Sequence, residues 1–260
     1  MTYRDPDPNV SQPAAAPQQA GLRLPLSKPV ITYVLLGIII VMFVADYAIT
    51  QFAGERIVFF FGAQWNELVA QGWYWQLFTS IFLHSGLTHL LFNSYALFIL
   101  GRDVEAFYSP KWFLVIYLLS GLAGSVAWYV LGDPVPSVGA SGAIFGLIGA
   151  EAAFFVRNRK LFGQFGRQRL GNLAVLIAIN LVFGFTIPNI NNIAHLGGLA
   201  GGFLLGYFIA PAFSMGYRDG ALFGERELVD NRTRAQRLWV IAVSVTVLIA
   251  LVLIGNQRWV

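Results

Sequence analysis

VITYVLLGIIIVMFVADYAI, the stretch at residues 30–49, decides the class of fold. Its one charged residue is Asp46, and a run of about 20 apolar residues is what a helix needs to cross the hydrocarbon core of a bilayer. The rest of the chain has the same character, because 57% of its 260 residues are hydrophobic and 12% are charged. A soluble domain carries about 25% charged residues. The sequence therefore predicts a polytopic membrane protein.

We expect an all-α membrane bundle of six core helices followed by a seventh transmembrane helix. After 30–49, the predicted spans cover residues 87–107, 112–131, 140–156, 173–185, 194–212 and 238–254. Residues 1–29 are rich in Pro, Ala and Gln and have no apolar signal segment, which predicts a disordered cytoplasmic tail before an uncleaved first span. The organisation that follows is a core at 30–213, a basic cytoplasmic linker at 214–237, and a seventh helix with a short outer tail at 238–260.

The distribution of basic residues predicts the orientation. With the N-terminus in the cytoplasm, all 17 Lys and Arg residues except Arg56 and Arg258 fall in inner segments, as the positive-inside rule requires. The net charge of +4 is therefore a topology signal, and we expect no nucleic-acid partner. The chain has no cysteine, which excludes disulfides and thiolate chemistry.

The first outer connection, residues 50–86, is long and rich in Phe, Trp and Tyr. Aromatic rings with a polar edge favour the membrane–water interface. We expect this connection to lie partly in the outer leaflet, and the alternative is a small extramembrane hairpin.

The candidate chemistry lies at the outer ends of three spans. The chain has three histidines, and each is predicted at an outer end: His84, His89 and His195. Spans two, four and six enter the bilayer from the same side, so Ser141, at the start of span four, shares the depth of His89, Asn93 and His195. A single histidine in such a place is more often a helix cap, but four polar side chains in one layer of an apolar bundle indicate a site.

Each residue type suits one role in amide hydrolysis. A serine hydroxyl needs an adjacent base, and histidine is the usual one, so we expect Ser141 to be the nucleophile and His195 the base. His89 and Asn93 are four residues apart and share a helix face. Together with the backbone N–H of Ser141 they can donate hydrogen bonds to an oxyanion.

Glycines predict close packing of spans four and six. Gly142, Gly146 and Gly149 lie at helical spacing in one, and Gly198, Gly202 and Gly206 in the other. Small residues four apart let transmembrane backbones approach each other, although such stripes are common and indicate little alone.

No acidic third member is evident from the sequence. Glu151 lies ten residues beyond Ser141, about 15 Å deeper, and we expect it to pair with Arg157 or Arg159. Nothing positions Asp133, in the loop before Ser141. The sequence therefore predicts a Ser–His dyad, with no metal and no cofactor.

Three motifs in this order resemble the rhomboid family of intramembrane serine proteases. HSGLTHLLFN matches its H-x4-H-x3-N signature, GASGAIFG its G-x-S-G element with Gly139 and Gly142 around the serine, and AHLGGLAGG the element of its catalytic histidine. The resemblance covers roughly residues 65–211.

The resemblance implies several further roles. Glu105 would help to hold the first outer loop, Phe145 would stack on the catalytic imidazole, and span five would act as a lateral substrate gate. Independently of the resemblance, we expect a structural or water-binding role for His84, because it precedes span two and faces the loop. Relatives often have Trp-Arg where this chain has Trp75-Gln76, which leaves the anchoring of the first loop open. The seventh span resembles the six-plus-one arrangement of some members.

The predicted function is cleavage of the transmembrane segments of other membrane proteins. The partners are these substrates and the lipid bilayer, in the bacterial inner membrane or alternatively an organelle membrane, with the active site opening outward. The sequence does not predict an oligomeric state. An inactive relative that binds client proteins is the main alternative, and a small transporter or channel is a weaker one.

Overall fold

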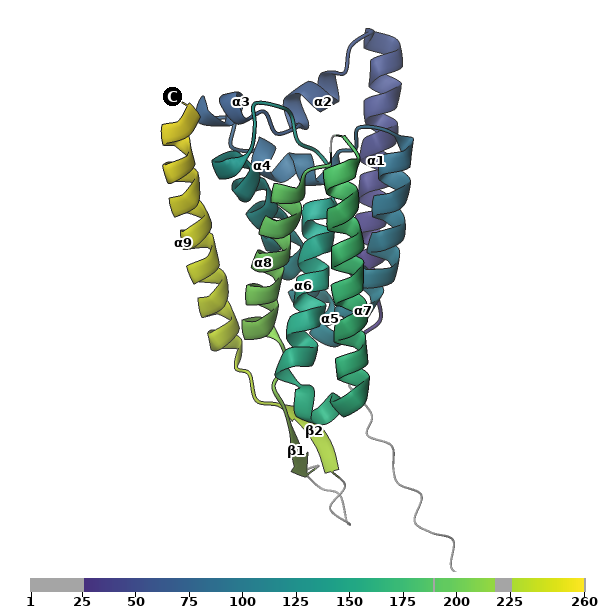
Figure 1. Cartoon of the computed structure of the whole chain (residues 1–260), viewed down its shortest axis with the longest axis vertical. Helices are drawn as coiled ribbons and strands as arrows, with labels where there is room; N and C mark the ends of the chain where they lie inside the picture. The colour runs from purple at the N-terminus through teal and green to yellow at the C-terminus, as the bar shows by residue number, and fades with distance from the viewer. Residues whose placement is uncertain (1–25, 189, 218–225, 260) are drawn as a thin grey trace, which may run out of the picture.

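A computed structural model describes residues 26–188, 190–217 and 226–259, and it forms a bundle of long helices with a small hairpin at one end (Figure 1). The elements in chain order are α1 (Val30–Ala53), α2 (Ile57–Gly62), α3 (Asn66–Ala70), α4 (Gln76–Thr79), the 3-10 helix η1 (Ser80–Phe82), α5 (Leu87–Leu131), α6 (Ser141–Arg157), α7 (Arg159–Thr186), α8 (Asn192–Ile209), β1 (Phe213–Tyr217), β2 (Arg226–Asp230) and α9 (Arg234–Trp259). The predicted tail at 1–29 lies outside the described residues up to residue 25.

Helix α5 contains two of the predicted spans. It has 45 residues, about 68 Å of helix, which is twice the thickness of a bilayer core. Ser109 breaks it with φ 67° and ψ 158°, and Pro110 begins the second half, where a missing N–H costs nothing. Five helices of the described chain, α5 among them, are long and apolar enough to cross a membrane. Helix α6 has 17 residues, about the shortest length that spans. The chain is an integral, multi-pass membrane protein.

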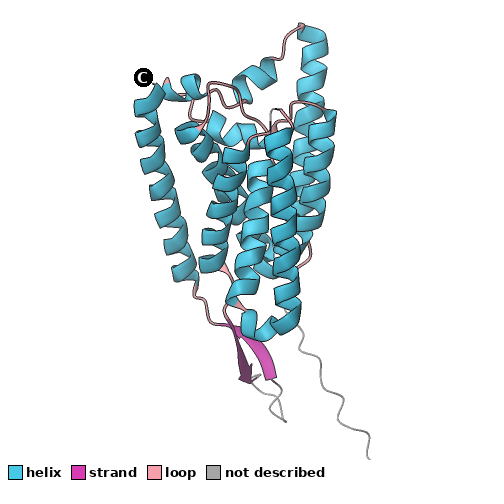
Figure 2. Cartoon of the chain, in the orientation of Figure 1, coloured by secondary structure: helices cyan, strands magenta, loops and turns pink. Residues whose placement is uncertain are grey.

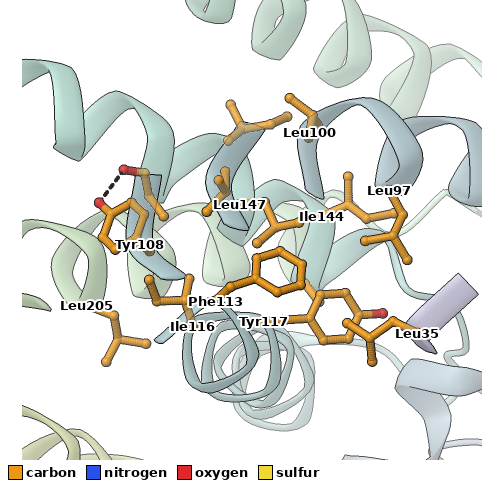
Figure 3. Packing of buried hydrophobic residues seen from close by; sticks show 14 of the residues in the cluster. Leu35, Leu97, Leu100, Tyr108, Phe113, Ile116, Tyr117, Ile144, Leu147 and Leu205 are labelled. Carbon is orange, nitrogen blue, oxygen red and sulfur yellow. Dashed lines mark hydrogen bonds between the residues drawn. The ribbon is translucent and has the colours of Figure 1, made fainter. Parts of the chain in front are cut away.

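Helix α6 lies at the centre of the bundle, between α5 and α8, and most of its side chains are buried. The apolar core packs Leu97, Phe113 and Tyr117 of α5 together with Ile144 and Leu147 of α6 (Figure 3). The one polar contact drawn there is the hydroxyl of Tyr108, which donates to the carbonyl of Ala150 at 2.7 Å. The predicted nucleophile, Ser141, therefore begins a helix that is packed on most of its sides.

The glycine stripes allow α6 and α8 to touch through their backbones. A Cβ atom on Gly198 would overlap the carbonyl oxygen of Gly142, and one on Gly202 would overlap that of Gly146. Gly142 itself is less constrained, because a Cβ there would lie 3.5 Å from the nearest atom. Gly149 of α6 is constrained like the α8 glycines, because a Cβ there would overlap the carbonyl oxygen of Leu199. The close approach therefore depends on glycines of both helices.

Helix α7 begins well before the predicted span at 173–185. Arg167 and Arg169 interrupt the apolar pattern, yet α7 starts at Arg159 and bends at Gly163 (φ 49°). It remains helical because Arg169 is paired: its Nε lies 2.5 Å from Glu151 and its Nη2 lies 2.6 Å from Asp103.

The segment predicted as a basic linker contains a β-hairpin. Strands β1 and β2 pair antiparallel from Phe213 opposite Asp230 to Tyr217 opposite Arg226, and residues 218–225 between them lie outside the described chain. Helix α9 then starts at Arg234, four residues before the predicted seventh span. We call this the hairpin end. The start of α6 and helices α2 to α4 lie at the opposite end (Figure 1), away from the hairpin drawn in magenta in Figure 2. We call it the active-site end after the predicted site.

The first long connection folds into the short helices α2, α3, α4 and η1. Trp73 stacks on Phe61 and on Trp75, with ring centroids 5.5 and 5.0 Å apart. Gln76, at the position where the resemblance implies an arginine, is fully buried. It accepts a hydrogen bond from the N–H of Trp65 at 3.0 Å and donates to the carbonyl of Phe60 at 3.3 Å. Gln76 thus anchors the loop from within.

Candidate active site

Ser141 and His195 form a hydrogen-bonded pair at the active-site end. The Oγ of Ser141 lies 2.9 Å from Nε2 of His195. Ser141 is the first residue of α6 and His195 lies in the first turn of α8, so the close contact of these two helices sets the distance. A hydroxyl within hydrogen-bonding distance of an imidazole has the geometry of an activated nucleophile.

Phe145 and Asn191 fix the imidazole and its helix. The rings of Phe145 and His195 are stacked, with centroids 4.2 Å apart and an interplanar angle of 8°. Asn191 caps α8, because its side chain accepts from the N–H of Ala194 at 2.9 Å. The same side chain donates to the hydroxyl of Ser137 at 3.0 Å. Asn191 therefore links the start of α8 to the loop before Ser141.

The connection between α1 and α5 also holds the loop before Ser141. Gln64 and Ser137 exchange two backbone hydrogen bonds of 3.0 Å, and the N–H of Gly139 donates to the carbonyl of Ser80 at 3.0 Å. Gly139 has φ 129°, and a Cβ atom on it would lie 2.7 Å from the ring of His89 and 3.7 Å from Oγ of Ser141. Only glycine adopts this conformation without strain.

His89 lies beside Gly139 and therefore close to Ser141. Its Nδ1 is 3.1 Å from the hydroxyl of Ser85. When that hydroxyl donates, Nε2 carries the proton and can donate in turn. Asn93 is buried one turn further along and uses one amide proton on the carbonyl of His89 at 3.0 Å. The second proton of this amide is available to another acceptor.

His84 is more deeply buried than the other two histidines, with 1% of its surface exposed. Its ring lies edge-on to that of His89, with centroids 5.0 Å apart, and neither ring nitrogen has a hydrogen-bond partner among the described residues. Burial, and then the nearby charge of His89, lowers the pKa of His84 from 6.5 to about 3. The ring is therefore neutral at neutral pH.

The resemblance implied that Glu105 helps to hold the first outer loop, but its hydrogen bonds go to a different part of the chain. Its buried carboxylate accepts from the N–H groups of Ile31 and Thr32 at 2.8 and 2.7 Å, and from the Thr32 hydroxyl at 2.7 Å. It caps the start of α1, at the end opposite the loop, because it lies about 27 Å along α5 from Leu87. An acidic group here satisfies N–H groups that the helix leaves unpaired.

Glu151 pairs with Arg169, not with Arg157 or Arg159 as expected. The bend at Gly163 turns α7 back along α6, so a residue farther along the sequence reaches the carboxylate. Nδ1 of His195 has no partner among the described residues, and the Asp133 side chain is exposed. In this part of the chain, no three His, Asp or Glu side chains are placed to hold a metal ion.

Sequence reasoning missed the residues that position the Ser141 loop. Asn191 was detectable, because asparagine just before a helix start is a cap signal. Gln64 and Ser80 act through backbone groups, which leave no signal in residue identity.

Comparison with known proteins decides the family. The profile of the Rhomboid domain matches residues 71–212. The chain belongs to the rhomboid family. That stretch contains all the rhomboid motif residues, from His84 to His195, and ends just before the hairpin.

Individual rhomboid relatives support the same assignment. Rhomboid protease GluP of Bacillus subtilis (strain 168) is 42% identical over 202 residues, which is 77% of this chain but only 38% of that protein. Putative rhomboid protease YdcA of the same organism is 41% identical over 145 residues, 55% of this chain and 71% of that one. Inactive RHOMBOID-like protein 8 of Arabidopsis thaliana is 36% identical over 140 residues, 53% of this chain and 38% of that one.

Proposed function

We propose that this rhomboid is an intramembrane serine endopeptidase that cleaves transmembrane segments of other proteins. The observation that carries the proposal is the 2.9 Å contact between Oγ of Ser141 and Nε2 of His195, on helices whose backbones touch. One relative is called inactive, and an inactive, client-binding role is the alternative. The chain has both Ser141 and His195, within hydrogen-bonding distance of each other, which favours the protease over the inactive, client-binding role.

The reaction is acyl transfer through a serine ester. Oγ of Ser141 attacks the carbonyl carbon of the scissile peptide bond while Nε2 of His195 accepts the hydroxyl proton. His195 then gives that proton to the leaving amine nitrogen as the C–N bond breaks. A water molecule, deprotonated by His195, attacks the ester and releases the carboxylate product and Ser141. The stacked ring of Phe145 keeps the imidazole in place through both steps.

The oxyanion that forms in each step is stabilised by three donors. The N–H of Ser141 is at the N-terminus of α6, where the helix leaves it unpaired and the helix dipole favours negative charge. Nε2 of His89 and the second amide proton of Asn93 supply the others. Loss of one such donor lowers the rate by about 100- to 1000-fold, which is the effect that we expect of His89→Ala and of Asn93→Ala.

Substrate access follows from the attachment of α7. Among the described residues of α7 only Gly166 and Leu173 are buried; Gly166 lies toward the hairpin end and Leu173 near the middle of the helix. Arg169 fixes the same part by its two ion pairs. Beyond Leu173, α7 is joined to the start of α8 by a hydrogen bond from the Asn192 amide to the Leu181 carbonyl at 3.2 Å. Opening of this bond would let that half of α7 swing about the attachment and admit a substrate helix, as the resemblance implies for span five. The substrate must unwind locally, since a helix shields its own carbonyls.

The test compares three forms of the purified chain in liposomes with a fluorogenic single-span substrate. We expect Ser141→Ala and His195→Ala each to lower the cleavage rate by about 10⁴-fold or more, while Ser244→Ala in α9 leaves it unchanged. A serine-directed fluorophosphonate should label the wild type and not Ser141→Ala. Cleavage or labelling that survives Ser141→Ala would refute the assignment, and absence of both in the wild type would favour the client-binding role.

A further inference from the structure

A basic cavity of about 410 Å³ lies at the hairpin end, between the end of α6, the start of α7, the end of α8 and β1. Its lining includes the cationic side chains of Arg157, Arg159 and Lys160, together with Tyr207 and Phe213. Helix α6 separates it from Ser141 by about 24 Å, so it is distinct from the proposed active site.

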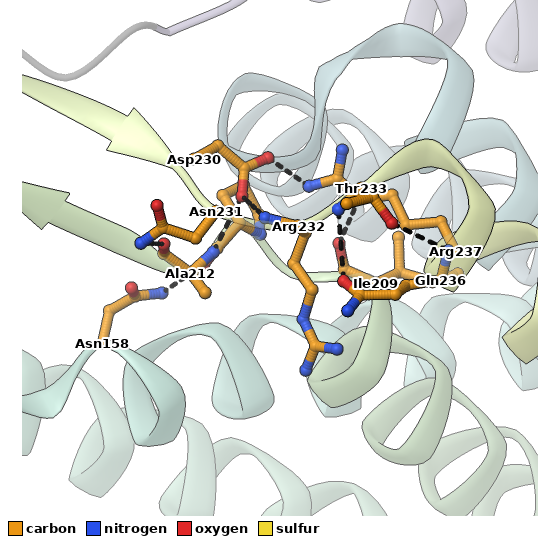
Figure 4. Close-up of polar contacts among 10 residues, drawn as sticks. Asn158, Ile209, Ala212, Asp230, Asn231, Arg232, Thr233, Gln236 and Arg237 are labelled. Carbon is orange, nitrogen blue, oxygen red and sulfur yellow. Dashed lines mark hydrogen bonds and ion pairs between the residues drawn. The ribbon is translucent and has the colours of Figure 1, made fainter.

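Two partly buried arginines have unsatisfied donors: Arg157, which lines the cavity, and Arg232, which lies near Arg157 but is not one of the lining residues. Arg157 packs over the ring of Tyr207 at 5.1 Å, and its Nη1 makes a long hydrogen bond of 3.4 Å to the Tyr207 carbonyl. The Nε atoms of Arg157 and Arg232 are both buried and have no hydrogen-bond partner within the described ranges. Figure 4 shows the Arg232 side chain extending from the hairpin toward the helix ends, away from Asp230. A buried guanidinium donor without an acceptor is costly.

The nearby carboxylate does not neutralise this cluster. Asp230 forms an ion pair with Arg237 and accepts from the N–H groups of Ala212 and Arg232 at 3.0 Å each. Burial, followed by the like charges of Arg157 and Arg237, lowers the pKa of Arg232. The described side chains around the cavity therefore carry an excess of positive charge.

We propose that this cavity binds the phosphate group of an anionic phospholipid in the leaflet at the hairpin end. Arginine presents a planar fork of donors that matches phosphate oxygens, and basic pockets at the ends of transmembrane helices suit lipid headgroups. The flanking side chains of Val156 and Phe208 are exposed on the helices, where they can contact acyl chains. This apolar border favours a lipid over a free phosphate ion.

Native mass spectrometry of the full chain tests the site. The protein is released from nanodiscs of phosphatidylcholine with or without phosphatidylglycerol, and retained lipids are counted. A parallel titration adds inorganic phosphate. The test variant is Arg157→Gln/Arg232→Gln. The matched control is Lys28→Gln/Arg102→Gln, which removes the same charge from exposed side chains near α1 and α5. Arg157→Lys/Arg232→Lys keeps the charge and removes the fork.

We expect the wild type and the control to retain phosphatidylglycerol preferentially. The preference should fall by about fivefold per arginine removed, so about 25-fold in the Gln pair, and by a smaller factor in the Lys pair. An equal preference in the Gln pair and the wild type would overturn the proposal. The wild type could instead bind inorganic phosphate saturably, lose that binding in the Gln pair, and show no lipid preference. This result would overturn the proposal that the phosphate group belongs to a lipid. Melting curves of all variants in phosphatidylcholine alone show whether each remains folded.

Discussion

The α6–α8 contact and the attachment of α9 represent two ways of holding a membrane helix. In the most apolar stretch of α5, beside α6, 56% of residues are buried, compared with 6% in α7 and in α9. At the centre, the absence of side chains on Gly198 and Gly202 brings two backbones together and fixes the distance from Ser141 to His195. The peripheral helices instead carry large apolar side chains outward, where lipid can cover them.

Helix α9 is held at its two ends by polar contacts. At the active-site end, Asn256 accepts from the hydroxyl of Tyr129 at 2.6 Å and donates to that of Tyr74 at 3.1 Å, and Nε1 of Trp259 donates to the carbonyl of Tyr129 at 2.7 Å. At the hairpin end, Nε of Arg237 donates to the carbonyl of Ile209 at 2.9 Å. Direct backbone packing therefore holds the helices that carry the proposed chemistry, whereas side-chain hydrogen bonds at its two ends hold α9.

The largest effect is expected from a substitution that breaks the backbone contact between α6 and α8. Gly202→Val places a side chain on the Gly146 carbonyl, and we expect a loss of about 3 kcal/mol of stability, measured as a lower midpoint of unfolding in detergent. Gly37→Val is the control, because nothing lies within 4 Å of a Cβ at Gly37. Equal losses in the two variants would mean that the backbone contact does not hold the bundle.

A smaller effect separates site geometry from backbone strain. Gly139→Ala strains a positive φ and presses on the ring of His89, so we expect cleavage to slow by about 100-fold in a folded protein. Gly72 also has a positive φ, of 105°, with open space around it. Gly72→Ala should therefore destabilise the protein but leave the rate of substrate cleavage unchanged. A Gly139→Ala variant with the wild-type rate would contradict the proposed role of His89.

The pH dependence of stability tests the burial of His84. Its pKa is about 3 when folded and about 6.5 when unfolded, so the unfolded chain takes up a proton first as the pH falls. The contribution of His84 is complete above pH 6.5 and decreases by about 2 kcal/mol by pH 5. His84→Phe should show a shallower decrease than the wild type between pH 7.5 and 5. Equal slopes would contradict the neutral, buried ring.

The smallest effect belongs to α9. Asn256→Ala removes its hydrogen bonds to Tyr129 and Tyr74, and we expect a loss of about 1 kcal/mol with little change in cleavage rate. Thr246→Ala, in the exposed middle of α9, serves as the control in the same thermal assay. A loss of several kcal/mol in Asn256→Ala would show that α9 belongs to the structural centre.

Hydropathy predicted the bundle of long apolar helices, and motif spacing selected the candidate site residues, because apolar runs and short polar signatures are local in sequence. The start of α7 was missed because Arg167 and Arg169 look like a loop until Glu151 and Asp103 supply partners. The hairpin at 213–230 pairs two strands of mixed polarity with no alternation to reveal them. The roles of Glu105 and Glu151 depend on which helix ends meet, and no pattern within one helix encodes that.

The separation of Ser141 and His195 in the chain has a consequence for biosynthesis. Their hydrogen bond joins residues 54 positions apart, and ribosomes add about 5–20 residues per second. For roughly 3–11 s after Ser141 is added, the nascent chain therefore lacks His195. While α8 is still being synthesised, the unfinished protein lacks the base of the proposed protease, so the proposed cleavage cannot begin in the insertion machinery.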